Sequence, residues 1–266
     1  MLAEKYILKG TDFYKNLSSF FSIFNKFFNL KPLRWFAIWA MVISGNNVVM
    51  HIEDRWFYWK WDSFSLYLFI ALIISIIFDF IFTSKLKNIT NYSPYLYQLI
   101  IFVYGYALFL IGANPLYLSL DLLTFGIPYV LFFLVGHMTW KLSFNAVSEP
   151  IPSKKDLIPS LVFIILCTII ISTAGFINDD PMISTIAALF LPFPLVAVLF
   201  PIAIRHFQRC RMYVVFIPTM FLTMRYPWFI FLTLPLFLFS RYYFYFISGK
   251  VIPTFKVDSP DHEFIK

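Results

Sequence analysis

Apolar runs of about 20 residues recur along this chain and constrain its fold more than any other feature. As a helix, a run of that length spans the roughly 30 Å hydrocarbon core of a bilayer. The runs are continuous and do not alternate with polar residues, which favours helices over a β-barrel. The composition agrees, because a chain that is 60% hydrophobic and only 13% charged is unlike a soluble domain. The sequence therefore predicts an all-α, polytopic transmembrane helical bundle.

Eight membrane segments are predicted between residues 33 and 248. Their approximate ranges are 33–51, 63–84, 95–113, 116–136, 157–177, 181–204 and two segments within 212–248. The sixth contains Pro192, Pro194 and Pro201, so we expect it to be kinked or broken. The last two are separated by Arg225-Tyr226-Pro227 and are either two crossings or a re-entrant hairpin.

The polar segment 137–156, HMTWKLSFNAVSEPIPSKKD, is the longest interruption of the apolar pattern. It divides the predicted bundle (33–248) into halves at 33–136 and 157–248. Residues 1–32 form a separate amino-terminal segment, and residues 249–266 form a cytoplasmic tail. Any chemistry that the protein performs is expected at the central segment and the loops on the same side.

Basic residues are distributed unevenly between the two sides of the predicted bundle. Of the 21 Lys and Arg residues, 17 fall in the termini and loops of one side, which the positive-inside rule places in the cytoplasm. Both termini are therefore predicted to be cytoplasmic, and the expected location is a bacterial inner membrane. The net charge of +7 is explained by this topology, and we expect membrane lipids, not nucleic acid, as partners.

Residues 11–29 predict an amphipathic helix with apolar residues on one face. We interpret it as a helix lying on the membrane surface, the alternative being a helix packed on a partner subunit. The apolar face consists of Phe13, Leu17, Phe20, Phe21, Phe24, Phe27 and Phe28.

Two features of the sequence bear on packing inside the bundle: the polar residues within a segment and the number of glycines. Asn46 and Asn47 in the first segment are costly against lipid and are expected to face the interior. Glycine is scarce, at eight residues, which argues against close helix packing through small residues.

A membrane enzyme that handles a diphosphate needs carboxylates to hold magnesium and basic groups to meet phosphate oxygens. Asp79 at the end of the second segment and Glu149 in the central segment are the candidate metal ligands. Asn145 is a candidate metal or diphosphate contact, and Lys154 and Lys155 are candidate phosphate partners.

Several stretches resemble the UbiA family of membrane prenyltransferases. They are LKPLRWFAIW near the start, and then Met138-Thr139-Trp140, KKDLIPSLVF, FINDDP and SRYYFYF in the second half. The family's aspartate-rich motifs are altered here. The first retains Asp79, and the second reads LSFNAVSEP, in which Asn145 and Glu149 keep the spacing.

This resemblance implies magnesium-dependent transfer, or binding, of an isoprenoid chain carried as a diphosphate. Two other classes of function remain open at this point. One is a non-catalytic subunit of a larger membrane complex, which keeps the fold without the ligands. The other is a small-solute transporter, favoured by the proline-interrupted sixth segment and by Asn46 and Asn47.

Overall fold

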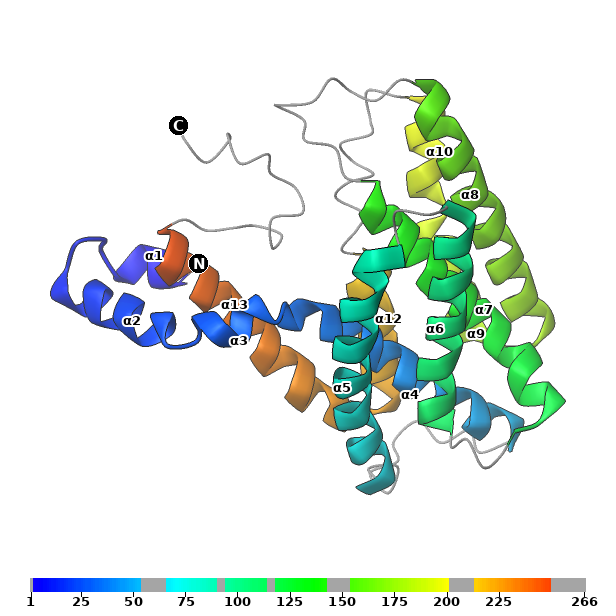
Figure 1. Cartoon of the computed structure of the whole chain (residues 1–266), viewed down its shortest axis with the longest axis horizontal. Helices are drawn as coiled ribbons and strands as arrows, with labels where there is room; N and C mark the ends of the chain where they lie inside the picture. The colour runs from blue at the N-terminus through cyan, green and yellow to red at the C-terminus, as the bar shows by residue number, and fades with distance from the viewer. Residues whose placement is uncertain are drawn as a thin grey trace.

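The computed structural model of the chain describes residues 2–53, 66–89, 94–113, 118–142, 154–200 and 213–249. Over these ranges it consists of helices and contains no strand, which confirms the predicted all-α class (Figure 1). In chain order the elements are α1 (Leu2–Tyr6), α2 (Asp12–Ser22), α3 (Asn25–Asn29), the 3₁₀ helix η1 (Pro32–Arg34), α4 (Trp35–Ile52), α5 (Leu66–Ile89), α6 (Pro94–Ala113), α7 (Leu120–Lys141), α8 (Lys154–Ile177), α9 (Pro181–Phe190), α10 (Pro192–Leu199), α12 (Tyr213–Arg225), the 3₁₀ helix η4 (Pro227–Phe229) and α13 (Ile230–Ser248).

Six described stretches are helical, long and apolar enough to cross a bilayer, which indicates a multi-pass membrane protein. Two further apolar helices are shorter over their described residues and lie at Leu68–Phe82, within α5, and at Tyr213–Arg225, which is α12. All eight stretches occupy predicted segment positions. The six longer ones are Pro32–Ile52, Tyr95–Ala113, Leu120–Trp140, Leu157–Ile177, Pro181–Leu199 and Pro227–Ser248.

Helix α4 lies in the interior of the bundle, in contact with α5, α6, α7 and α12. Its approach to α6 is closest where Gly45 of α4 and Gly112 of α6 meet the opposite backbone. A β-carbon added at Gly45 would overlap the carbonyl oxygen of Phe109, and one added at Gly112 would overlap that of Val42. The expectation that scarce glycine argues against close packing is wrong at this crossing, because one glycine per helix is enough to bring two backbones together.

The predicted break in the sixth segment is confirmed. Helix α9 ends at Phe190 and α10 begins at Pro192, with Leu191 between them. Proline has no amide hydrogen and its ring clashes with the preceding turn, so Pro192 and Pro194 fit at the start of a helix better than inside one.

Both ends of the central polar segment are helical. Helix α7 continues through Lys141, and α8 begins at Lys154. Thr139 is fully buried within α7 and donates its hydroxyl to the Val135 carbonyl oxygen at 2.8 Å, which satisfies a polar side chain inside the helix.

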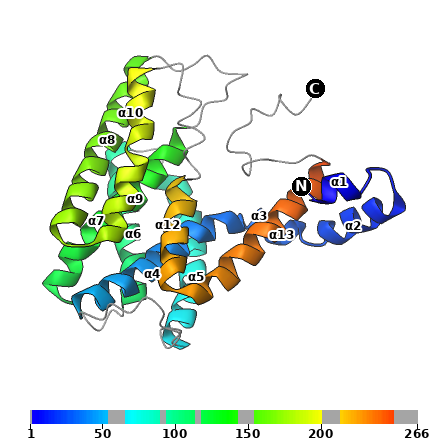
Figure 2. The same cartoon turned by 180° about the vertical axis from the view of Figure 1, so that it is seen from behind.

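The amino-terminal helices α1, α2 and α3 lie alongside the carboxyl-terminal part of α13, which extends away from the other helices (Figures 1 and 2). The ring of Phe28 stacks on that of Tyr243, with 3.6 Å between centroids, and Phe21 stacks on Phe246 at 5.1 Å. Tyr243 also donates a 2.8 Å hydrogen bond to Asn25. The apolar face of residues 11–29 therefore packs in large part on this chain's own α13.

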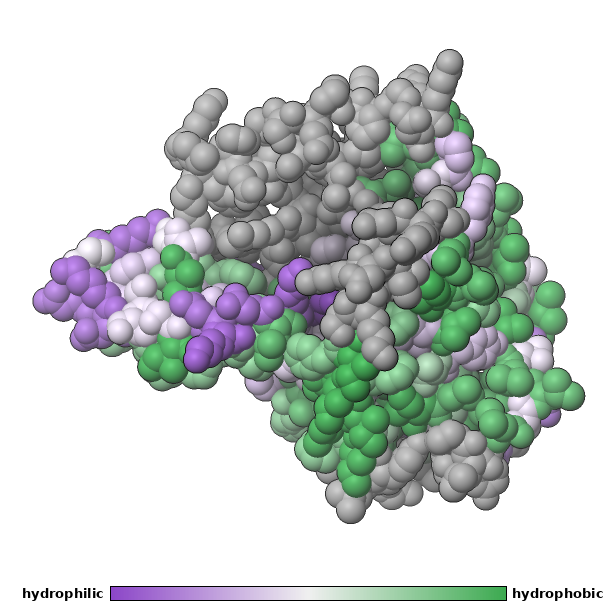
Figure 3. All heavy atoms as spheres, viewed as in Figure 1, coloured by the Kyte–Doolittle hydropathy of each residue, from purple (hydrophilic) through white to green (hydrophobic). Residues whose placement is uncertain are grey.

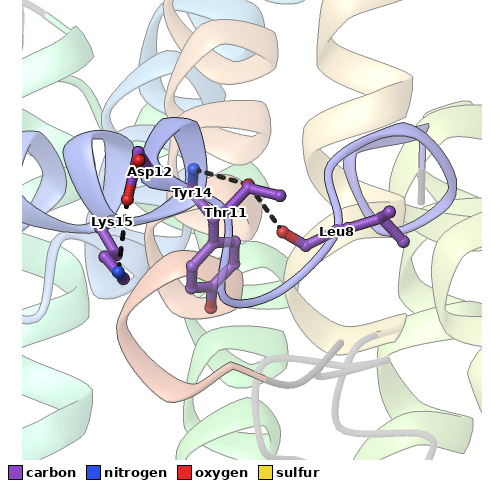
Figure 4. Close-up of polar contacts among 5 residues, drawn as sticks. All are labelled: Leu8, Thr11, Asp12, Tyr14 and Lys15. Carbon is purple, nitrogen blue, oxygen red and sulfur yellow. Dashed lines mark hydrogen bonds and ion pairs between the residues drawn. The ribbon is translucent and has the colours of Figure 1, made fainter.

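Two residues of that face remain exposed, Phe13 at 61% and Phe20 at 50%, so the predicted contact with a membrane surface stays a prediction. The start of α2 is fixed by Thr11, whose hydroxyl accepts from the Tyr14 amide at 3.2 Å and donates to the Leu8 carbonyl at 2.8 Å (Figure 4). An ion pair of 3.3 Å joins Lys15 to Asp12 in the first turn. Hydrophilic residues gather on α1 and α2 in the face that Figure 3 shows, whereas hydrophobic residues cover much of the described bundle there.

Candidate functional site

A cavity of about 610 Å³ lies among α3, η1, α4, α5, α6, α7, α12 and α13. This volume is in the range of small-molecule and cofactor sites. We call it the main cavity. Most of its lining is aromatic or aliphatic, and its members are Phe28, Lys31, Pro32, Leu33, Arg34, Phe36, Ala37, Ile38, Asp79, Tyr97, Tyr104, Phe132, Phe133, Gly136, His137, Trp140, Val214, Val215, Phe216 and Phe244.

The charged residues of the lining are Lys31, Arg34 and Asp79. Lys31 and Arg34 are exposed, whereas Asp79 is buried at 4% exposure. Tyr104, Phe132 and Phe133 are buried as well. The main cavity therefore has a basic, accessible end and an apolar, enclosed end.

Asp79, a predicted metal ligand, lies in this cavity with its carboxylate already engaged. Its Oδ1 lies 3.2 Å from the Arg34 guanidinium and accepts a 2.8 Å hydrogen bond from the Tyr104 hydroxyl. A carboxylate inside an apolar bundle is costly unless it is paired, and these two donors offset that cost.

Tyr104 is held in place by ring stacking. Its ring lies parallel to that of Phe82, with 4.0 Å between centroids and 5° between planes, and Phe78 stacks beside it at 5.7 Å. These contacts aim the hydroxyl at Asp79 from α6. The site is thus assembled from three separate stretches: η1, α5 and α6.

Lys31, directly before Pro32, has a left-handed backbone with φ 55°. A residue other than glycine, asparagine or aspartate rarely adopts this conformation, at a cost on the order of 1 kcal/mol. The strained backbone lies where the amino-terminal segment turns into η1, and it puts the lysine on the lining of the main cavity.

His137, the first residue of the central polar segment, was not predicted as a site residue, and its position in the cavity was missed. The ring lies 4.6 Å from that of Phe133 and lines the cavity with Gly136 and Trp140. The signal was present in the sequence, because positions 133, 136, 137 and 140 share one face of a helix.

The structure does not describe the other predicted site residues at the level of their side chains. Asn145 and Glu149 lie outside the described residues. Lys154 and Lys155 form the first turn of α8, and only their backbone is described. Of the predicted site residues, Asp79 is the one whose side chain the structure describes, and it lines the main cavity.

The described residues do not by themselves fit a magnesium ion. Among the described residues that line the main cavity, Asp79 is the only acidic one, and its Oδ1 already faces a guanidinium and a phenol. Within the described ranges, no three His, Cys, Asp or Glu residues come together as a metal site would require. Magnesium prefers several oxygen ligands in octahedral geometry, so we derive no step through this ion.

A second polar cluster lies where the carboxyl-terminal part of α4 meets α7 and the start of α9. Asn47 donates to the Tyr129 hydroxyl at 3.1 Å, and Tyr129 donates to Asp180 at 2.6 Å. The other oxygen of Asp180 accepts the Met182 and Ile183 amides and thereby caps α9. Asn47 is 1% exposed, which confirms that it faces the interior.

The carboxyl-terminal end of α12 completes this cluster. Arg225, predicted in an interruption between apolar segments, is instead a buried residue of the last turn of α12. It acts electrostatically on Tyr129 and Tyr226. Tyr226 is fully buried and donates to Asn46 at 2.9 Å.

Comparisons of the chain with protein-family models, curated proteins and solved structures found no match. The likeness to the UbiA family therefore stays a prediction from the stretches of sequence given above. One of them, LKPLRWFAIW, supplies Lys31, Arg34, Phe36 and Ala37 to the lining of the main cavity. Another, SRYYFYF, supplies Phe244.

Proposed function

We propose that this multi-pass membrane protein binds an isoprenoid lipid phosphate in the main cavity. The apolar chain occupies the enclosed end, and the phosphate meets Lys31 and Arg34 at the exposed end. The observation that supports the proposal is the polarity of the cavity, which has two cationic side chains at one end and mostly aromatic walls at the other.

Arg34 suits this role although it is paired with Asp79. A guanidinium carries five N–H donors in a planar fork, and the contact with Asp79 is made by one terminal nitrogen. A phosphate oxygen can therefore be met by the remaining donors. Asp79 would hold the fork in position, and Tyr104 would hold Asp79.

Binding is the part of the expected function that the described residues support. Transfer of the isoprenoid chain would need a further carboxylate beside Asp79, for which the sequence predicts Glu149, with Asn145 as a metal or diphosphate contact. Lys154 and Lys155 would then lie near the leaving phosphate. This catalytic extension depends on residues 143–153, which lie outside the described part of the chain.

The orientation that we propose has eight membrane segments and both termini in the cytoplasm of a bacterial inner membrane. The unequal distribution of Lys and Arg supports this orientation. It would place Lys31, Arg34 and the exposed end of the cavity at the cytoplasmic face, where water-soluble isoprenoid diphosphates are available. Reporter tags at each terminus, tested for protease access in sealed vesicles, would measure the orientation.

The proposed function can be tested with geranylgeranyl monophosphate and the full chain in lipid nanodiscs. Arg34→Gln should weaken binding by about tenfold or more, since a charged hydrogen bond contributes on the order of 1.5–3 kcal/mol. Gly136→Leu should also weaken binding, because it puts a side chain into the cavity. Val103→Leu, on an exposed position of α6, is the control. If wild type, Arg34→Gln and Gly136→Leu bind the probe with the same affinity, the proposal is refuted.

Small-solute transport is a second candidate, favoured by the buried polar cluster of Asn47, Tyr129, Asp180 and Arg225 and by the interrupted pair α9 and α10. Reconstituted vesicles would test it. Uptake of a solute that Asn47→Ala abolishes would support transport over lipid binding.

A further inference from the structure

A second, smaller cavity continues the main cavity toward the opposite end of the bundle. Its volume is about 40 Å³, and four residues line both cavities: Ala37, Phe132, Phe133 and Val214. The space exceeds the roughly 10–15 Å³ that one water needs. The shared residues form the wall between the two spaces.

The residues that line the two cavities follow one another in the same spatial order along three helices. Along η1 and α4 the lining proceeds from Arg34 through Ala37 to Ser44, and on α12 it proceeds from Val214 to Leu222. Helix α7 runs in the opposite sense, from Trp140 back to Tyr129. From Ala37 to Ser44 the rise of a helix adds about 10 Å of depth.

The far end of the second cavity is closed by the second polar cluster. Tyr129 lines it, and its hydroxyl is bound to Asp180 and Asn47. Most other lining residues are apolar, among them Met41, Ile186 and Leu222. The space therefore suits more of an apolar chain and not a polar solute.

The two phenylalanines at the wall are braced by different neighbours. Phe133 packs over Gly105 of α6, where an added β-carbon would lie 2.9 Å from the ring, and beside Tyr104 at 5.9 Å. Phe132 meets Phe190 of α9 edge to face at 5.9 Å. A chain that enters from the basic end reaches these rings before it reaches the second cavity.

We propose that Phe132 and Phe133 limit the length of the isoprenoid chain that the protein binds. Removing either ring joins the two cavities and extends the apolar space toward Tyr129. This inference rests on the proposed function, and it adds to it the residues that determine specificity for chain length.

The test compares farnesyl, geranylgeranyl and hexaprenyl monophosphate as probes for the full chain in nanodiscs. Phe132→Ala and Phe133→Ala should shift the preference toward the longer probes. The expected change in the ratio of Kd values is about tenfold or more, because each additional buried methylene favours binding. Leu134→Ala, a buried truncation on α7 outside both linings, should leave the ratio unchanged.

A second substitution separates chain length from general loosening of the bundle. Ala40 lines the second cavity only, so Ala40→Val should not affect the wild-type preference. In the Phe132→Ala background the same substitution should cancel the gain for long probes, since it refills the joined space. Phe132→Leu gives a milder variant if the alanine variant does not fold, and its shift should be smaller in the same direction.

The outcomes separate this inference from the function on which it rests. If wild-type protein binds no probe, the proposed function fails and the inference fails with it. If wild-type protein binds but the wall variants and Leu134→Ala share its chain-length profile, the inference alone is overturned. A shift caused by the wall variants and reversed by Ala40→Val supports both.

Discussion

The guanidinium of Arg34 lies 3.2 Å from the carboxylate of Asp79, a contact between residues 45 positions apart in the sequence. It joins η1 to α5 at the main cavity. The Asp79 side chain is 6% exposed and that of Arg34 is 40% exposed, so the pair is buried on one side and accessible to solvent on the other. This geometry gives the two residues unequal roles in stability.

Arg34→Gln should lower the free energy of unfolding more than Asp79→Asn does. The first change removes the charged partner of a buried carboxylate, at a cost of about 1–2 kcal/mol after allowance for solvent screening. The second leaves a neutral amide that still accepts from Tyr104 and exposes an arginine that water can solvate. Thermal unfolding in detergent measures both, and equal losses would contradict this account.

Removing magnesium should not change binding of a monophosphate lipid to the described site. The Asp79 carboxylate is engaged by Arg34 and Tyr104, so the positive charge near the phosphate comes from Arg34 and Lys31. The Kd of geranylgeranyl monophosphate is measured with and without a chelator, in wild type and in Asp79→Asn. The opposite result would be a large loss of affinity when the chelator is added to wild type and no such loss in Asp79→Asn. That result would make Asp79 a metal ligand.

Tyr129→Phe should destabilise the bundle by about 1–2 kcal/mol, because it removes the 2.6 Å hydrogen bond to Asp180 and the partner of Asn47. Tyr106→Phe is the matched control. Its hydroxyl also joins α6 to α7, at 2.7 Å from the Leu123 carbonyl oxygen, but that hydrogen bond is exposed. Denaturant unfolding should separate the two variants, and a larger effect of Tyr106→Phe would refute the role of the buried cluster.

Gly112→Ala should be strongly destabilising, by about 2 kcal/mol or more, because the added carbon meets the backbone of Val42, which cannot move aside without shifting α4. Gly136→Ala adds the same group at a helical position where the nearest atom is a Val214 methyl at 3.3 Å. The thermal midpoint of Gly136→Ala should stay near that of the wild type. Comparable midpoints for both variants would argue against the close crossing of α4 and α6.

Substitutions of Lys31 can separate its charge from its backbone strain. Lys31→Asn and Lys31→Gln both remove the ammonium, so both should weaken binding of the lipid phosphate. Asparagine tolerates the left-handed conformation better than glutamine, so Lys31→Asn should be the more stable by about 0.5–1 kcal/mol. Equal stabilities would mean that the conformation at residue 31 carries no strain.

The helical segments could be predicted from the sequence because each depends on local composition. Apolar runs predicted the eight helical stretches. Prolines predicted the break between α9 and α10, and Arg225-Tyr226-Pro227 predicted the interruption at the end of α12. Asn47 of α4 was costly against lipid, which predicted its buried position, and the half-buried Asn46 accepts a hydrogen bond from Tyr226. These signals act within one helix and need no knowledge of its neighbours.

The candidate site was predicted only in part. Asp79 was predicted as a site residue, but its pairing with Arg34 and Tyr104 was not, since the three residues belong to different elements. The aromatic face of α2 could be recognised, whereas its packing on α13 could not, because a membrane and a helix offer the same apolar surface to such a face. The close crossing at Gly45 and Gly112 was also missed, because the number of glycines does not show which of them lie against one another.

The sequence by itself determined that this chain forms apolar helices, roughly which stretches of the chain form them, and which residues are costly to expose to lipid. Those properties follow from the energy of transferring each side chain and its backbone into hydrocarbon. Only the tertiary structure decided which helices touch, and therefore that Arg34, Asp79 and Tyr104 share one cavity whose far wall is Phe132 and Phe133. In lipid one apolar helix surface resembles another, so the choice of neighbours depends on close packing and on a few polar contacts between distant parts of the chain.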